Sequence, residues 1–410
     1  IYTVPDAVVY EVRTKLRKRL IDHVKELLKD EVAASYFTPR QVIQIRETLR
    51  DDILTIGFAR RFATYKRAHL LFTDLDRLAK IVNNEKFPIQ FVFTGKAHPA
   101  DGGGQGLIKH IVEISRRPEF LGKIIFLENY DMRLARHLIA GVDVWLNTPT
   151  RPLEASGTSG EKAEMNGVLN FSVLDGWWYE GYKQGAGWAL TDKRTYENQQ
   201  YQDQLDAATI YHILETEIIP TYYARNSKGY SPEWIQYIKN SMSEIAPDYT
   251  MKRMLDDYID RFYNKLATRS AHLHENGFAE AKAIAAWKEE VAEHWDSFQV
   301  ESFTCSQDLA IDGPVVGKEY NFNLVIDRHE LKGMLGVEMV VTKENPDNHQ
   351  LELLATEQFK LIKEEGSKLF FELKTASSEA GLHKMGFRVY PVNKELPHRM
   401  DFAFVRWIQL

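Results

Sequence analysis

The stretch that decides the fold is Glu154-Ala-Ser-Gly-Thr-Ser-Gly-Glu-Lys-Ala-Glu-Met-Asn-Gly-Val-Leu-Asn-Phe-Ser-Val-Leu-Asp-Gly-Trp-Trp178. Residues 155–160 form a loop of small residues, whose glycines let backbone amides approach a ligand and whose hydroxyl side chains add hydrogen-bond donors. A helix is predicted over 161–168, so its free amides and positive dipole end would face the same ligand. The loop therefore suits a phosphate group, although a plain turn before a helix would look similar.

Lys162 lies inside this predicted helix, shortly after the small-residue loop. A lysine beside a bound phosphate could neutralise it, or could form a Schiff base with a carbonyl cofactor whose own phosphate the loop holds. The residues alone leave both roles open.

Short apolar runs alternate with helical patterns around this loop. Strands are predicted over 52–58, 89–93, 123–127, 142–146 and 168–174, and helices through 70–78 and over 105–116 and 132–140. This alternation predicts an α/β, Rossmann-like lobe with a parallel sheet and right-handed crossovers. Because the carboxyl ends of parallel strands share one edge, we expect the loops that contain Arg61, Gly95, Tyr130 and Glu154 to converge there.

Four cations occupy the turn after the first predicted strand: Arg60, Arg61, Lys66 and Arg67. Cations at the start of a helix oppose its dipole, which favours an anion site over a solvated basic surface. Two or three of them could hold an anion such as phosphate. Further along, His98 is interpreted as capping a turn rather than as catalytic.

Two other features near these loops have competing interpretations. The glycine run 102–104 lacks the spacing of a dinucleotide-binding motif and is predicted to be a flexible turn. The pair Trp177 and Trp178 could stack on a sugar ring or could belong to the core.

Composition limits the function classes. The 410 residues predict two or three domains, and the net charge of −6, from 52 basic and 58 acidic residues, argues against a nucleic-acid partner. The single cysteine, Cys305, cannot form an internal disulfide and fits a reducing cytoplasm. No apolar run approaches 18 residues, so no membrane partner is expected.

The rest of the chain is predicted to contain helices followed by a β domain. Residues 8–30 read as an amphipathic helix with Val12 and Leu16 on its apolar face, and helices are predicted over 201–225, 231–245, 250–269 and 278–296. Alternating apolar residues from Phe298 onward predict an antiparallel sandwich of seven or eight strands. Its role is open between glycan binding and packing. The predicted domains are 1–50, 51–200, 201–296 and 297–410.

The run Glu154-Ala-Ser-Gly-Thr158 with Lys162 resembles the pyridoxal phosphate loop of the alpha-glucan (glycogen and starch) phosphorylases. The stretches 59–67, 94–99, 126–130 and 249–263 resemble the same family, so the likeness covers roughly residues 1–295. It implies reversible phosphorolysis of alpha-1,4-glucan to glucose 1-phosphate with pyridoxal 5'-phosphate as cofactor. It also implies that the chain is the second lobe of a two-lobe GT-B fold, as in bacterial-type members with an extra C-terminal β domain.

The resemblance assigns a role to each matching residue. Lys162 would carry the cofactor, while Thr158, Ser159 and Arg60 would hold its phosphate and Tyr130 would pack beside it. Arg61 and Lys66 would bind inorganic phosphate. The glucose hydroxyls would bind to Glu154, Ala155, Ser156 and Gly157. Asp131 stands where many relatives have arginine.

Two other functions share parts of this pattern. A nucleotide-sugar-dependent glucan synthase has the same fold but places a second glutamate eight residues after the first, where this chain has Lys162. A non-catalytic glycan-binding scaffold would need no cofactor. The start of the sequence without Met reads as a fragment, so we expect an N-terminal lobe as partner and an inactive isolated chain, with homo-oligomer formation left open.

Overall fold

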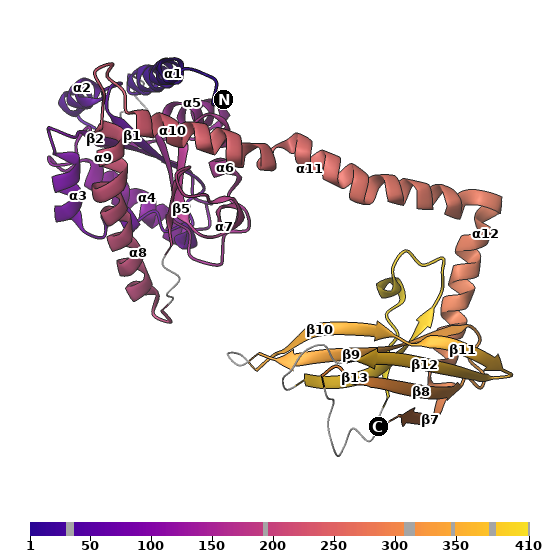
Figure 1. The fold of residues 1–410 in the computed structure, drawn as a ribbon. Coiled ribbons are helices and arrows are strands. Elements are labelled where there is room, and N and C mark those ends of the chain that lie inside the picture. The colour runs from indigo at the N-terminus through magenta and orange to yellow at the C-terminus, as the bar shows by residue number, and fades with distance from the viewer. Residues whose placement is uncertain (30–36, 192–195, 307–315, 346–348, 377–382, 409–410) are drawn as a thin grey trace. The chain divides into compact units, whose positions relative to one another are not determined.

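The computed structural model describes residues 1–29, 37–191, 196–306, 316–345, 349–376 and 383–408. The chain forms two compact units, Ile1–Tyr258 and Ile259–Leu410 (Figure 1). The finer boundaries at residues 50, 200 and 296 stay predictions. Within the described ranges, no helix has the length and apolar character needed to cross a membrane.

The first unit is built on a six-stranded parallel sheet with the order β3-β2-β1-β4-β5-β6. Its strands are β1 (Leu54–Ala59), β2 (Ile89–Thr94), β3 (Ile124–Leu127), β4 (Val144–Asn147), β5 (Leu169–Val173) and β6 (Trp188–Leu190). The predicted α/β class is confirmed, and β6 is an addition that the sequence did not predict. The strand order reverses between β1 and β4, and the carboxyl ends of the strands at such a reversal are where sheets of this kind bind ligands.

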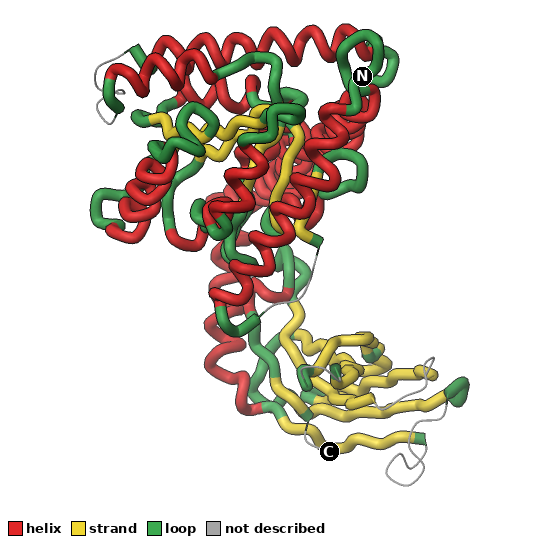
Figure 2. The backbone as a smooth tube through the Cα atoms, turned by 90° about the vertical axis from the view of Figure 1, so that its left-hand side faces the viewer, coloured by secondary structure: helices red, strands yellow, loops and turns green. Residues whose placement is uncertain are grey.

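Every residue of these six strands is buried, because helices cover both faces of the sheet (Figure 2). Alternate side chains enter two separate cores. Val144 and Leu146 of β4 join the cluster on one face, and Trp145 joins the cluster on the other. Continuous apolar runs are therefore what these strands require.

The crossover helices largely follow the predicted pattern, with two corrections. They are α3 (Leu75–Val82), α4 (Gly102–Ser115), α5 (Met132–Gly141), α6 (Thr158–Met165) and α7 (Trp177–Gly181). The glycine run 102–104 is not a flexible turn, since Asp101 caps α4 by accepting the Gly104 amide at 2.9 Å. The helix predicted through 70–78 is interrupted, with a short 3-10 turn η2 (Leu70–Phe72) before α3.

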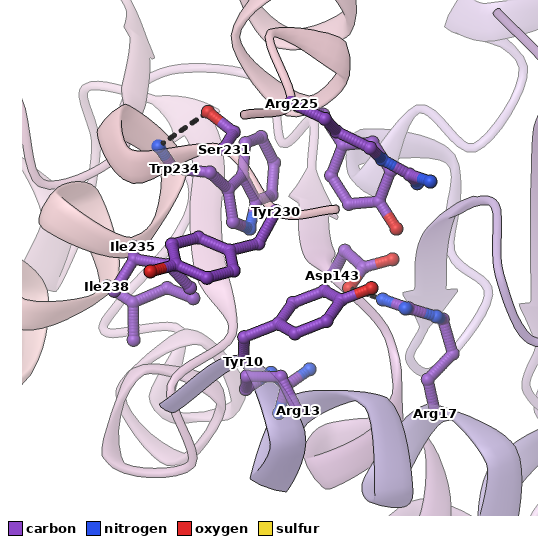
Figure 3. Close-up of a pocket in the computed structure, with 11 residues that line it drawn as sticks. Tyr10, Arg13, Arg17, Asp143, Arg225, Tyr230, Ser231, Trp234, Ile235 and Ile238 are labelled. Carbon is purple, nitrogen blue, oxygen red and sulfur yellow. Dashed lines mark hydrogen bonds and ion pairs between the residues drawn. The ribbon is translucent and has the colours of Figure 1, made fainter. Parts of the chain in front are cut away.

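The N-terminal helices are α1 (Asp6–Leu27) and α2 (Pro39–Thr48). The apolar face predicted for α1 is wrong at Val12, which is 50% exposed, whereas Arg13 and Arg17 are buried. Arg17 pairs with the buried Asp143 at 2.6 Å (Figure 3). Arg13 donates to the carbonyl of Ala140 at 2.6 Å. The two arginines thus anchor α1 to the sheet.

Asp143 directly precedes β4, so this anchor lies at the amino edge of the sheet. A small hollow of about 20 Å³ adjoins it, lined by aromatic and apolar side chains and by Arg13, Arg17 and Arg225 (Figure 3). The predicted ligand site lies at the opposite edge of the sheet, after the carboxyl ends of the strands.

A set of helices completes the first unit. They are α8 (Gln199–Ile213), a π-turn η3 (Leu214–Ile218), α9 (Ile219–Tyr223), α10 (Pro232–Asn240), η4 (Ser241–Ile245), η5 (Ala246–Tyr249) and α11 (Met251–Tyr258). The helical segments predicted over 201–225 and 231–245 match these positions.

The second unit begins with η6 (Ile259–Tyr263), α12 (Asn264–His294) and η7 (Trp295–Ser297). Eight strands follow: β7 (Gln299–Cys305), β8 (Glu319–Asp327), β9 (Met334–Glu344), β10 (Leu351–Gln358), β11 (Lys360–Glu365), β12 (Lys368–Ala376), β13 (His383–Val392) and β14 (Arg406–Trp407). They form two antiparallel sheets, β10-β9-β13-β14 and β11-β12-β8-β7, around one apolar core. The predicted β-sandwich is confirmed.

The last strand of the sandwich, β14, is short. The 3-10 turn η8 (Arg399–Phe402) precedes it, and Arg406 and Trp407 pair with Val389 and Arg388 of β13.

Candidate functional site

The loops after β1 and β4 meet at the point where the strand order reverses. The carboxylate of Glu154 accepts hydrogen bonds from Arg60 Nη2 at 2.9 Å and from Lys66 Nζ at 2.5 Å. The side chains of Arg60, Lys66 and Glu154 are only 8%, 10% and 10% exposed, respectively. The predicted convergence of these two loops is therefore confirmed, and it gives a buried cluster of two cations and one carboxylate.

Arg60 keeps unused donors inside this cluster. Burial lowers the pKa of its guanidinium below the ordinary value, and the neighbouring Glu154 carboxylate offsets only part of that effect. Its Nε and Nη1 atoms are buried and have no hydrogen-bond partner among the described residues. Buried donors of this kind are normally satisfied, so Arg60 is ready to bind an anionic oxygen.

Tyr65 contacts two of the cations in this turn, Lys66 and Arg61. Lys66 Nζ lies 4.5 Å from the centroid of its ring. Burial acts to raise the pKa of the Tyr65 hydroxyl, but hydrogen bonds with Lys66 and Arg61 outweigh it, and this pKa lies below its ordinary value. Arg61 itself is exposed, so its charge faces solvent beside the cluster.

Arg67 serves the fold instead. It is 2% exposed, donates to the carbonyls of Thr148 and Pro149, and pairs with Asp203 at 2.9 Å. Of the four cations in the turn, Arg60, Arg61 and Lys66 are therefore the three that remain candidates for binding an anion.

The helix after the small-residue loop begins earlier than predicted. Gly157 adopts a left-handed conformation with φ of 89°, and α6 starts directly after it at Thr158 rather than at Glu161. The first-turn amides of α6, which have no partner within a helix, thus belong to Thr158 and Ser159. The Ser159 hydroxyl accepts a hydrogen bond from Trp145 Nε1 at 3.2 Å, which ties this turn to β4.

The loop after β5 holds the small-residue loop in place. The Glu154 amide donates to Asp175 Oδ2 at 2.9 Å, and the Trp177 amide donates to the Ser156 carbonyl at 2.8 Å. Gly176 allows this approach, because a Cβ there would lie 2.3 Å from the Ser156 carbonyl oxygen. Asp175 is thus a site residue that sequence reasoning missed; the Asp-Gly pair at the end of a strand was the available signal.

The surroundings of Trp177, Trp178 and His98 decide between their competing interpretations. Trp177 and Trp178 are 6% and 1% exposed. Their rings pack against each other at a tilt and edge-to-face against Tyr249 and Tyr182, so they belong to the core. The Ala100 amide donates to His98 Nδ1 at 3.1 Å, which confirms the turn-capping interpretation.

Some predicted site residues lie apart from the charged cluster. Lys162 is exposed on α6, and its ammonium makes no hydrogen bond or ion pair with any described residue. Ala155 and Thr158 are also exposed. Tyr130 is half-buried after β3, where burial raises its pKa, and it packs against the same apolar cluster as Ala163 of α6.

Glu164 is an unexpected feature of α6. Its side chain is fully buried, and neither carboxylate oxygen has a hydrogen-bond partner among the described residues. Burial raises the pKa of this carboxyl well above its ordinary value of 4.5. The folded protein therefore holds Glu164 protonated at pH values where the unfolded chain ionises it.

We expect Glu164→Gln to remove a pH-dependent loss of stability. Because the pKa of Glu164 is higher in the folded state, its contribution to the free energy of unfolding is fully present below pH 4.5 and is lost as the pH rises through the folded-state pKa. Each unit of difference between the two pKa values corresponds to about 1.4 kcal/mol. Urea unfolding should give similar free energies for both proteins near pH 4 and a more stable variant at pH 7. The exposed Glu180→Gln is the control. Parallel pH profiles for the wild type and Glu164→Gln would contradict this account.

The fold and the site define a Rossmann-type lobe with a cluster of cations at the carboxyl edge of its sheet. A family model described as "Carbohydrate phosphorylase" matches residues 10–182, and one described as "Glycogen phosphorylase C-terminal domain" matches residues 295–409. The chain belongs to the alpha-glucan phosphorylase family, as its motifs indicated.

Individual relatives agree with the family models. Maltodextrin phosphorylase from Thermococcus litoralis is 37% identical over 429 residues, which cover 98% of this chain and 47% of that protein. Glycogen phosphorylase from Aquifex aeolicus is 46% identical over 263 residues, or 64% of this chain and 38% of that protein. Among solved structures, Anabaena Alr3699/HepE in complex with UDP and glucose matches with a TM-score of 0.38 at 17% identity, covering 56% of this chain and 53% of that one. The chain thus spans about half, or less, of the length of these two curated relatives.

Proposed function

We propose that this chain provides the cofactor and phosphate lobe of an alpha-glucan phosphorylase that acts in the cytoplasm. The enzyme would transfer the terminal glucosyl unit of an alpha-1,4-glucan to inorganic phosphate and release glucose 1-phosphate. The observation that carries the proposal is the buried cluster of Arg60, Lys66 and Glu154 at the switch point of the sheet. Lys162 stands where the related glucan synthases need glutamate, which disfavours a nucleotide-sugar-dependent glucan synthase as the function.

The residues present fit pyridoxal 5'-phosphate. Arg60 has two buried donors without a partner, the first turn of α6 offers the amides of Thr158 and Ser159, and the Lys162 ammonium is free. Arg60, Thr158 and Ser159 would hold the cofactor's phosphate, Tyr130 would pack beside the cofactor and Lys162 would attach it covalently. When bound, the cofactor would supply a phosphate that exchanges a proton with the substrate phosphate.

The chain's own groups would bind and orient the substrates. Arg61 and Lys66 would hold inorganic phosphate and neutralise the charge that builds up when two phosphates lie side by side. Glu154, Ala155, Ser156 and Gly157 would bind the glucose hydroxyls. Asp175 fixes the backbone of Glu154 by accepting a hydrogen bond from its amide, and Arg60 would still hold the Glu154 carboxylate when Lys66 turns to the phosphate.

An exposed apolar stripe supports the proposal that another lobe packs against this chain. Three side chains at helical spacing on α11 are between 42% and 65% exposed: Met251, Leu255 and Tyr258. Contiguous exposed apolar surface usually marks a contact with another protein part. We propose that the N-terminal lobe of the longer protein packs there.

We expect Arg61→Ala to weaken phosphate binding by roughly 10- to 100-fold, since a hydrogen bond to a charged group contributes about 1.5–3 kcal/mol. The measurement is KM for phosphate in an active protein that contains this chain and the N-terminal lobe. Arg117→Ala, which removes an exposed charge beyond the far end of α4, should leave KM unchanged. An unaltered KM in Arg61→Ala would show that this residue does not bind phosphate.

A further inference from the structure

Three potential metal ligands converge in the second unit, and the proposed phosphorylase chemistry uses none of them. His272, Glu280 and Glu395 each place one donor atom within 4.8 Å of the other two. His272 Nε2 lies 3.5 Å from Glu395 Oε2. In a tetrahedral zinc site with bonds of 2.0–2.1 Å, neighbouring donors lie about 3.4 Å apart. The spacing therefore already approaches that of a coordination sphere.

A break in α12 creates this proximity. His272 and Glu280 are eight positions apart, and a straight helix would separate them by about 12 Å along its axis. Residues 275–278 leave the helical conformation, and three of them, Asn276, Gly277 and Phe278, are left-handed (Figure 1). The chain thereby turns back and brings Glu280 beside His272.

The third ligand comes from a different part of the unit. Glu395 follows β13, and its carbonyl accepts a hydrogen bond from Arg269 Nη1 of α12 at 2.7 Å. Its Oε1 atom lies 3.7 Å from Lys394 Nζ, while Oε2 is the atom nearest His272. The loop is thus held against α12 with one carboxylate oxygen directed at the histidine.

A third carboxylate, that of Glu275, faces the other nitrogen of the histidine ring. Glu275 Oε2 lies 3.7 Å from His272 Nδ1, the nitrogen opposite the one that faces Glu395. In metal sites the second ring nitrogen of a histidine ligand usually faces a carboxylate, which places the proton there and leaves the other lone pair for the metal. Glu275 is placed for this role.

We propose that His272, Glu280 and Glu395 bind one zinc ion, with Glu275 as the partner of the histidine. One imidazole and two carboxylates suit zinc, and three protein ligands leave a position for water. The ion would join the two halves of α12 to the loop after β13. Such an ion would fix the bend of α12 against the sandwich.

The test is calorimetric titration of the chelator-treated chain with zinc chloride. We expect one zinc ion per chain, a loss of affinity of at least about tenfold in His272→Ala and Glu280→Gln, and a loss of roughly 10- to 100-fold in Glu275→Gln. His349→Ala is the matched control, since His349 pairs with a single carboxylate, Glu344, at 3.0 Å. Its affinity for zinc should equal that of the wild type.

A thermal scan gives a second readout. Zinc should raise the melting temperature of the wild type and of His349→Ala but not that of His272→Ala, since a ligand that binds only the folded state stabilises it. Circular dichroism establishes that each variant is folded. Absence of saturable zinc binding by the wild type, or equal affinity in His272→Ala, would overturn the proposal.

Discussion

This chain alone should release no detectable glucose 1-phosphate from a maltooligosaccharide and phosphate, whereas a longer protein that adds the N-terminal lobe should release it readily. The chain corresponds to 47% of the maltodextrin phosphorylase to which it is 37% identical. Under the proposed function, the missing part supplies the opposite wall of the glucan cleft. We expect the difference in rate to be among the largest effects of any change considered for this protein.

The size of the effect follows from positioning. Arg61 is exposed, and Lys162 has no hydrogen bond or ion pair with any described residue, so water surrounds both groups in the isolated chain. Orientation of the reactants contributes about 7–11 kcal/mol in well-organised systems, which corresponds to a factor of about 10⁵–10⁸ in rate. Rapid turnover by the isolated chain would refute this prediction. Silence from the longer protein would instead count against the phosphorylase assignment.

Lys162→Arg in the longer protein should reduce both cofactor content and activity to background. Arginine keeps the positive charge but stays protonated, so it cannot form a covalent bond with a carbonyl carbon. The readouts are the absorbance of bound pyridoxal phosphate and the release of glucose 1-phosphate. Lys183→Arg is the control, because Lys183 is exposed and, among the described residues, donates to the Glu244 carbonyl alone. A Lys162→Arg protein that retained cofactor and turnover would exclude the proposed attachment site.

The parallel sheet could be predicted from the sequence because its strands are buried on both faces. Continuous apolar runs such as 89–93 have few alternative structures when helices separate them. The meeting of the loops after β1 and β4, which contain Arg61 and Glu154, followed from topology alone, since parallel strands end at a common edge. The contacts of Arg60 and Lys66 with Glu154 did not. The three-residue strand β6 gave too short a pattern to be recognised.

Other features depended on tertiary contacts that local patterns do not contain. The buried face of α1 carries Arg13 and Arg17 because Asp143 and backbone carbonyls satisfy them, and a hydrophobicity pattern assigns arginines to the surface. The start of α6 depended on the left-handed conformation of Gly157, which one glycine among several does not reveal. The role of Asp175 likewise required the backbone contact with Glu154.

The measurement that tests the central claim most directly is borohydride reduction of the longer protein in the presence of pyridoxal phosphate, followed by peptide mapping with mass spectrometry. We predict that the reduced pyridoxyl group is found on the peptide that contains Lys162. A label on a different lysine, or an active protein that carries no label, would contradict the account.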